Sequence, residues 1–278
     1  MNNIPPLNAA AVLKRYGLRA DKTLGQNFLQ DHFALEAIVS AAGIQTTDTV
    51  LEIGPGLGSL TRYLAASAKN VVAVELDLNL LAPLQAVLSP YQNTRVIQGN
   101  ILDLSPSELI AEDDYLVAAN IPYYITSAVI RHLLESDVKP RRIVLTIQKE
   151  VAERICAKPG DLSLLALSVQ VYGSPRIAAR IPAEAFFPAP KVDSAVLCID
   201  IYAQPIVKPE LLKTFFKLVK AGFSQKRKTL RNALSSGLHI SPPDAEELLT
   251  KANIVSQRRA ETLSIAEWEQ LCEVMNNP

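Results

Sequence analysis

Cysteine and histidine are scarce in this sequence, and long apolar runs are absent. The three cysteines, Cys156, Cys198 and Cys272, are odd in number and lack metal-ligand spacing, so we expect them to be reduced and structural. The three scattered histidines favour no metal site either. No apolar run reaches the ~18–20 residues of a membrane span, and no early segment is typical of a signal peptide. We therefore expect a cytoplasmic protein that binds neither a metal nor a membrane.

An excess of one charge is also missing, because 28 basic residues balance 28 acidic ones. The distribution is nevertheless uneven, since the stretch 211–240 contains no acidic residue. Its seven basic residues are Lys213, Lys217, Lys220, Lys226, Arg227, Lys228 and Arg231. The first three share one helical face by their i, i+4, i+7 spacing. We predict that the last four contact nucleic-acid phosphates; the alternative is a solvated helix face, although such faces usually mix charges.

A glycine-rich turn follows Thr49–Ile53, which has the length and β-branched content of a buried parallel strand. Gly54, Gly56 and Gly58 allow positive φ and a close approach of a ligand before the helix that begins at Ser59. The spacing G-x-G-x-G differs from the G-x-G-x-x-G of dinucleotide-binding loops. The turn therefore favours S-adenosylmethionine over NAD.

The next two predicted strands supply polar side chains for such a nucleotide. The strand 70–75 ends at Glu75, which is placed to accept the ribose hydroxyls, although it can also be an ordinary solvated acid. The strand 95–98 leads to Asn100. This side chain can reach the adenine amine of the cofactor, or it can be a simple turn residue.

The segment Asn120-Ile121-Pro122-Tyr123-Tyr124 follows a fourth predicted strand, 114–119, at the sheet edge where ligands bind in doubly wound folds. An adenine amine is a weak nucleophile because its lone pair is delocalised into the ring. The Asn120 side-chain oxygen and the Ile121 carbonyl can accept the two amine hydrogens and direct the lone pair toward a methyl donor, while Tyr123 stacks on the base. A plain strand-to-turn junction is the alternative. Together with the upstream glycine turn, the segment predicts methyl transfer to an exocyclic amine.

Several segments together resemble the ribosomal RNA adenine N6,N6-dimethyltransferase family. They are 22–29, 52–61, 120–124, 186–194 and 223–232, and the resemblance extends from about residue 12 to about residue 272. Within the family the chain is most similar to the bacterial small-subunit enzymes, which dimethylate two adjacent adenines in the 3′-terminal hairpin of 16S RNA. The erythromycin-resistance relatives, which modify large-subunit RNA, are less similar through residues 223–232.

The resemblance implies a set of site residues. The S-adenosylmethionine contacts would be Asn27, Leu29, Gly54, Glu75, Asn100 and Asn120, and the catalytic residues Asn120, Ile121, Tyr123 and Phe186. Tyr123 and Phe186 would sandwich the target base. The family usually carries aspartate where this chain has Asn100, so an acceptor is kept but its charge is lost. The implied partner is small-subunit ribosomal RNA within an assembling 30S particle, and the implied state of the enzyme is a monomer.

The expected fold is α/β, a Rossmann-like seven-stranded S-adenosylmethionine-dependent methyltransferase sheet followed by a small C-terminal all-helical domain. Prolines near residue 205 predict a division into a methyltransferase domain, 1–204, and a helical RNA-binding domain, 205–278. We predict that 164–172 and 192–201 form the antiparallel pair of strands that closes the sheet. Helices are predicted near 209–222, 226–237, 242–251 and 264–275.

Two other functions are compatible with such a fold. One is a large-subunit ribosomal RNA adenine methyltransferase of the erythromycin-resistance type. The other is a non-catalytic RNA-binding assembly factor, since a fold does not fix a function. Intact donor and amine motifs argue against the second, because a protein without catalysis has no need for Asn120 or Glu75.

Overall fold

The computed structural model describes residues 4–112 and 114–276. The chain forms two compact units, Met1–Ala152 with Ser174–Ile201, and Glu153–Gly173 with Tyr202–Pro278. The chain passes from the first unit to the second for the last time after Ile201, close to the division that the sequence predicts at residue 205. Residues 153–173, which the sequence analysis assigned to the first domain, belong instead to the second unit.

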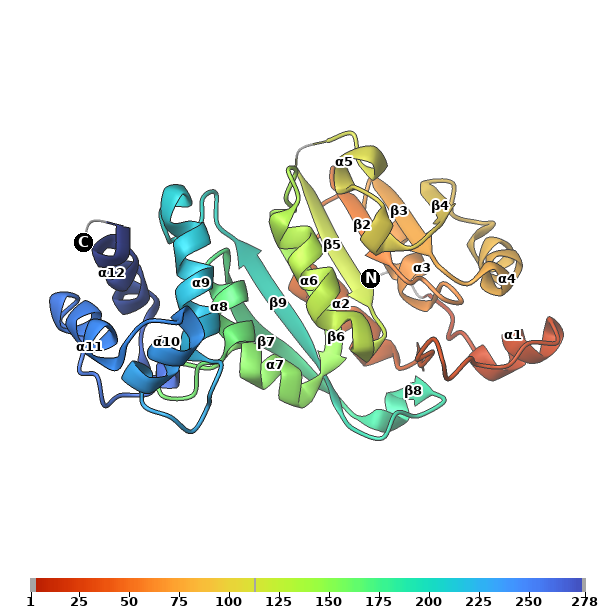
Figure 1. Ribbon diagram of the computed structural model, residues 1–278. Helices are drawn as coiled ribbons and strands as arrows, with labels where there is room; N and C mark the ends of the chain where they lie inside the picture. The colour runs from red at the N-terminus through yellow and green to blue at the C-terminus, as the bar shows by residue number, and fades with distance from the viewer. Residues whose placement is uncertain (1–3, 113, 277–278) are drawn as a thin grey trace. The chain divides into compact units, whose positions relative to one another are not determined.

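A seven-stranded sheet forms the centre of the first unit, with the strand order β4-β3-β2-β5-β6-β9-β7 (Figure 1). The strands are β2 (Thr49–Ile53), β3 (Asn70–Glu75), β4 (Thr94–Gln98), β5 (Tyr115–Asn120), β6 (Arg142–Gln148), β7 (Gly173–Ile181) and β9 (Ser194–Ile201). Strands β2 to β6 are parallel, and β9 is antiparallel to β6. The order runs outward in both directions from β2 and β5, so the crevice between their carboxyl ends is the expected ligand site of this architecture.

Helices cover the sheet on both faces. The helices of this unit are α1 (Ala9–Arg15), α2 (His32–Ala42), α3 (Ser59–Ser67), α4 (Leu78–Leu88), α5 (Pro106–Leu109) and α6 (Thr126–Glu135), with the short 3-10 helices η1 (Ile101–Asp103), η2 (Tyr123–Ile125) and η3 (Ala183–Ala185). Helices α2 and α3 share a core cluster with Val50, Leu116 and Val144. The residues next to these in the strands, such as Leu51 and Val117, are also fully buried. Burial of successive strand residues is expected for a sheet covered on both faces.

A small second sheet joins two further segments of the first unit. Its strands β1 (Phe28–Leu29) and β8 (Phe186–Phe187) are antiparallel, and Leu29 pairs with Phe186. Two segments that are distant in the sequence, and that the resemblance assigns to the donor and to the base, therefore meet directly.

The strand predicted for residues 164–172 is wrong, because Leu164–Gln170 is a helix, α8. A short apolar run has the same pattern in a buried strand and in a buried helix. Here the Ser163 hydroxyl accepts a hydrogen bond from the Ala166 N–H and caps the helix. The strand beside β9 is β7, which lies at the sheet edge. Its Pro175 and alternating exposed residues obscured it in the sequence, although proline is compatible with an edge strand.

The second unit is helical and has its own core. Its elements are α8, η4 (Pro209–Leu211), α9 (Leu212–Gly222), α10 (Leu230–Leu238), α11 (Pro242–Lys251), η5 (Ala260–Thr262) and α12 (Ile265–Asn276), and α7 (Lys149–Ile155) extends across the boundary. Phe215, Leu218 and Trp268 are fully buried in this core. Lys213, Lys217 and Lys220 are exposed, as their spacing predicts.

The helix predicted for 226–237 begins later than expected, at Leu230. Residues 224–228 form turns, in which the Lys228 N–H donates to the Gln225 carbonyl. Thr229 has the extended backbone of an N-cap residue. Lys226, Arg227 and Lys228 therefore lie on a loop and not on a helix face. Among all the described residues, no helix is long and apolar enough to span a membrane.

Candidate active site

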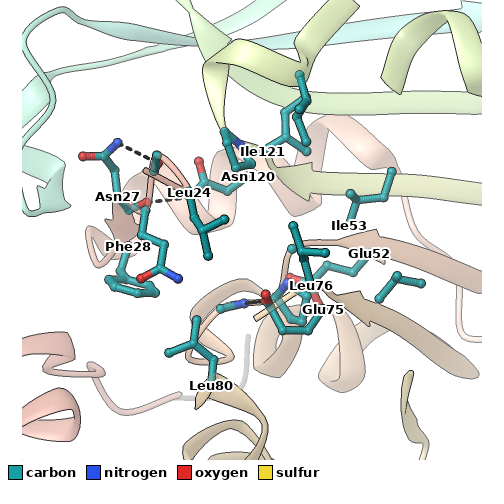
Figure 2. Close-up of a pocket in the computed structure, with 18 of the residues that line it drawn as sticks. Leu24, Asn27, Phe28, Glu52, Ile53, Glu75, Leu76, Leu80, Asn120 and Ile121 are labelled. Carbon is teal, nitrogen blue, oxygen red and sulfur yellow. Dashed lines mark hydrogen bonds between the residues drawn. The ribbon is translucent and has the colours of Figure 1, made fainter. Parts of the chain in front are cut away.

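A cleft opens where the strand order reverses, at the carboxyl ends of β2, β3 and β5 (Figure 2). Six chain segments contribute to its wall. All nine residues that the sequence analysis assigned to the donor and to the base line it: Asn27, Leu29, Gly54, Glu75, Asn100, Asn120, Ile121, Tyr123 and Phe186. The structure thus brings the predicted donor side and the predicted base side into one cavity.

The glycine turn shapes the floor of the cleft. Gly54 has φ +68°, and the nearest atom to an added Cβ would be the Asn120 carbonyl oxygen at 4.0 Å, so the space above it is open. Gly56 has φ +60°, and a Cβ there would lie 3.1 Å from the ring of Phe28. Both positions favour glycine for their left-handed backbone. The turn leaves room for a ligand to approach the main chain closely.

Glu75 is held at the end of β3 by the main chain. Its Oε2 accepts from the Gly56 N–H at 2.9 Å, and its Oε1 accepts from the Asp77 N–H at 2.8 Å. Burial raises the pKa of this carboxyl group, and the two N–H donors act in the opposite direction. The neighbouring Leu76 is 47% exposed and lines the same cleft. A fixed acceptor beside an apolar surface suits a nucleoside, whose sugar is polar and whose base is flat.

Glu52 is a second carboxyl group in this cleft, which the sequence analysis did not assign. It lies on β2, is 1% exposed, and lines the cavity near Glu75 (Figure 2). Burial raises its pKa to about 8, with a further contribution from the charge of Glu75. Its Oε2 has no hydrogen-bond partner among the described residues. An acid inside an otherwise apolar strand is the signal that identifies such a site from sequence.

The Asn120 side chain is oriented by the loop that precedes β1. Its Nδ2 donates to the main-chain carbonyl of Asn27 at 3.0 Å, and the Asn27 side chain donates to the Gly25 carbonyl at 3.1 Å (Figure 2). No donor among the described residues bonds to the Asn120 Oδ1. The amide nitrogen is therefore turned toward the Asn27 carbonyl, and the oxygen remains available as an acceptor.

Two polar residues that the sequence analysis missed support this geometry. The Gln26 Nε2 donates to Asp77 at 2.7 Å, and the Gln26 Oε1 accepts from the Asp21 N–H at 2.8 Å. Gln26 thus fixes the loop that holds Asn120. The Tyr123 hydroxyl bonds to the fully buried Ser194 hydroxyl at 2.7 Å. The Gln26–Asp77 and Tyr123–Ser194 contacts are not readable from sequence, because each joins distant segments.

Phe186 and Asn100 reach the cleft in different ways. Phe186 is only 4% exposed, since its pairing with Leu29 places it largely in the core. The Asn100 Oδ1 accepts from the Leu102 N–H at 3.2 Å, and its Nδ2 donates to Asp103 at 2.9 Å. Asn100 is therefore a turn residue that caps η1, and it also lines the cleft.

Comparison with known proteins identifies the family. The model of the ribosomal RNA adenine dimethylase family matches residues 17–277. The chain belongs to this family. The sequence-based prediction of a methyltransferase enzyme of this family is therefore confirmed, together with its seven-stranded α/β fold and helical C-terminal part.

Individual relatives cover almost the entire chain. A protein named ribosomal RNA small subunit methyltransferase A from Dehalococcoides mccartyi (strain CBDB1) is 48% identical over 99% of this chain and 96% of its own length. The protein of the same name from Alkaliphilus metalliredigens (strain QYMF) is 44% identical over 96% of each chain. Among solved structures, the 23S rRNA methyltransferase ErmE is 27% identical with a TM-score of 0.72, covering 90% of this chain and 100% of its own. A dimethyladenosine transferase from Plasmodium falciparum shares the fold, with a TM-score of 0.77 at 24% identity over 90% of this chain and 98% of its own.

The buried Glu52 predicts an unusual pH dependence of stability for this dimethylase-family chain. A carboxyl group with a pKa of 4.5 when unfolded and about 8 when folded binds more protons in the folded state between these values, so stability falls as the pH rises through this window. We expect Glu52→Gln to raise the free energy of unfolding at pH 8 by about 3–5 kcal/mol and to change it much less at pH 5. Urea titrations of the ligand-free protein from pH 5 to pH 8 measure this.

The matched control is Glu184→Gln, which removes an exposed carboxyl group in η3. This variant should retain the pH dependence of the native protein. A Glu52→Gln variant with the native slope between pH 5 and pH 8 would show that Glu52 is ionised in the folded protein.

Proposed function

We propose that this protein uses S-adenosylmethionine to dimethylate the N6 amine of two adjacent adenines in the 3′-terminal hairpin of small-subunit (16S) ribosomal RNA. The observation that carries the proposal is the Asn120 amide, whose nitrogen donates to the Asn27 carbonyl while its oxygen remains free in the cleft. The 48% identity with a protein named for the small subunit supports the choice of RNA. The proposal includes a monomeric enzyme that acts in the cytoplasm on an assembling 30S particle.

The cleft residues fit S-adenosylmethionine. Glu75 offers a fixed carboxylate to the two ribose hydroxyls, and Leu76 and Asn100 flank the place for the adenine. Gly54 leaves open space between β2 and β5, and Asn27 and Leu29 lie on the side assigned to the methionine end. When bound, S-adenosylmethionine supplies an electrophilic methyl group on a positively charged sulfur.

The target base has a separate set of residues. The Asn120 Oδ1 and the Ile121 carbonyl accept the two amine hydrogens, which draws the nitrogen lone pair out of the ring plane. Tyr123 stacks on the base from one side and Phe186 from the other, and the Ser194 hydroxyl fixes the Tyr123 ring. Because these acceptors are already in place, they stabilise the reorganised amine without moving.

In the second methylation, the adenine amine makes one hydrogen bond fewer to its two acceptors. After the first transfer the amine has one hydrogen left, so one acceptor is no longer satisfied. Asn120 is neutral, and an unmet neutral acceptor costs about 1–3 kcal/mol, less than a buried unmet carboxylate would. No strong base is needed, because the amine proton becomes acidic only as the methyl group arrives.

Phosphate binding is assigned to the loop between α9 and α10. Lys226, Arg227 and Lys228 are exposed there, and none of them has an ion-pair partner among the described residues. Arg231 is different, because its Nη1 lies 3.4 Å from the Glu246 Oε2. It must exchange this carboxylate for a phosphate, so its net contribution is smaller.

Large-subunit RNA is a second candidate substrate, since ErmE is 27% identical and its whole chain aligns with this one. The two functions are separated by incubating the protein and labelled donor with small-subunit particles and with large-subunit RNA. We expect label in small-subunit RNA, with monomethyladenosine appearing first and then converting to dimethyladenosine. Label confined to large-subunit RNA would replace the proposed substrate. A monomethyl product that persists with excess donor would contradict two-step transfer.

The amine-orienting role of Asn120 is tested by two substitutions. Asn120→Ala removes the acceptor, and Asn120→Asp retains an acceptor but cannot donate to the Asn27 carbonyl. We expect Asn120→Ala to lower kcat by about 100-fold or more, because the lost acceptor interaction strengthens as the amine reorganises. Asn120→Asp should also lower kcat, because the Asn27 carbonyl no longer orients the side chain. Single-turnover rates measure the effect, and donor binding by calorimetry shows whether the loop has also moved. A kcat close to the native value in Asn120→Ala would contradict the role.

Phosphate contacts predict a change in salt dependence. Neutralising Lys226, Arg227 and Lys228 to glutamine should lower the slope of log K against log salt for RNA binding by about 0.7–0.9 per contact removed. Lys251→Gln is the control, since Lys251 is also exposed in the second unit but pairs with Glu247 at 3.3 Å. If the loop variant has the same salt slope of RNA binding as the native protein, these three side chains do not contact phosphates.

A further inference from the structure

Tyr124 is an exposed aromatic residue at the rim of the cleft. Its side chain is 63% exposed, and it lines the cavity next to Tyr123. Its hydroxyl forms no hydrogen bond with any of the described residues. Single exposed aromatic residues are common on protein surfaces and need no explanation by themselves. This ring, however, lies beside the proposed base site.

The Tyr124 ring rests against a glycine turn. A Cβ at Gly25, which has φ +64°, would lie 3.4 Å from the Tyr124 Cε1 and 3.3 Å from the Pro122 Cβ. The turn itself is rigidly bonded, because the Gly25 N–H donates to the Lys22 carbonyl and the Gln26 side chain donates to Asp77. One side of the ring is therefore supported by the main chain, and the rest of it is open to solvent.

Lys22 begins the same turn and is exposed. It has no ion-pair partner among the described residues. The adjacent carboxylate of Asp21 forms no ion pair with it, and the Asp21 Oδ1 instead accepts from both the N–H and the hydroxyl of Thr23 at 2.7 Å. A free ammonium group and an open aromatic ring thus belong to two segments that touch at Gly25. These are the two groups that bind a nucleotide without reading its sequence, one for the phosphate and one for the base.

We propose that Tyr124 and Lys22 form a subsite for the nucleotide adjacent to the target adenine, with Tyr124 stacking on its base and Lys22 contacting its phosphate. This inference rests on the proposed RNA substrate. An adenine that enters the cleft leaves its neighbour without a stacking partner, and unstacking costs a few kcal/mol. Tyr124 directly follows Tyr123 in the chain, so it offers a replacement surface next to the captured base. Two adjacent adenines can then occupy the two positions in turn.

A double-mutant cycle tests the stacking contact, with Tyr124 changed in the protein and the neighbouring base removed from the RNA. Equilibrium binding is measured with a hairpin RNA that carries the target adenine and either an intact or an abasic neighbouring nucleotide. Tyr124→Ala should weaken binding of the intact RNA by roughly 5- to 150-fold, and Tyr124→Phe should bind nearly as the native protein does. With the abasic RNA, Tyr124→Ala and the native protein should bind alike. Phe33→Ala, which truncates an aromatic side chain that is 77% exposed and does not line the cleft, is the matched control.

The Lys22 contact has its own readout. Lys22→Gln should reduce the salt slope of RNA binding by about 0.7, the value for one phosphate of a single strand. Lys69→Gln is the charge-matched control, because Lys69 is exposed just before β3 at the opposite, amino edge of the sheet. Donor affinity should be unchanged in all these variants, which shows that the cleft is intact.

The outcomes separate this inference from the proposed function. Binding is measured without methyl transfer, and the product formed by the native protein decides the reaction independently. If Tyr124→Ala weakens intact and abasic RNA equally, or weakens neither, the stacking subsite is wrong. An unchanged salt slope in Lys22→Gln would show that Lys22 does not contact a phosphate. If the native protein forms dimethyladenosine but the effect of Tyr124→Ala does not depend on the neighbouring base, the proposed function stands and the proposed subsite is wrong.

Discussion

The hydrogen bond from the Asn120 amide to the Asn27 carbonyl connects two segments that line the cleft. Asn27 lies on a loop that Gln26 ties to Asp77, and Asn120 ends the central strand β5. The bond fixes which atom of the Asn120 amide faces the cleft. An amide that was free to rotate would present its donor as often as its acceptor, and the amine of an adenine needs the acceptor. In the proposed reaction, the orientation of Asn120 therefore depends on a loop that is distant in the sequence.

The predicted donor side of the cleft contains two buried carboxyl groups, Glu52 and Glu75. Glu75 is satisfied by two main-chain N–H groups, whereas Glu52 has an oxygen without a partner. Burial raises the pKa of both groups, and to about 8 for Glu52. Placing two acids close together in an apolar crevice destabilises the ligand-free protein. It also creates a site in which a positively charged ligand is favoured, because such a ligand stabilises the ionised carboxylates.

The sequence identified the central sheet correctly where the pattern was local. Thr49–Ile53 and Asn70–Glu75 are strands as predicted, because a continuous apolar run followed by a glycine turn or a polar residue is typical of buried parallel strands. It failed at 164–172, where the same apolar character belongs to a helix, and at β7, whose proline and exposed residues suit an edge strand. In both places the neighbouring segments distinguish the two conformations, the core of the second unit for Leu164–Gln170 and strand β9 for β7, and these neighbours are not visible in a local window.

For the site, the sequence by itself determined the residue types: glycines before a helix, a carboxylate at the next strand end, and an asparagine followed by a tyrosine. These follow from local backbone geometry and from the order of strands in a parallel sheet. Only the tertiary structure decided how these residues are held. The Asn27 carbonyl orients Asn120, Ser194 fixes Tyr123, and Leu29 pairs with Phe186. Each of these contacts joins segments far apart in the chain, so only packing of the complete fold could specify it.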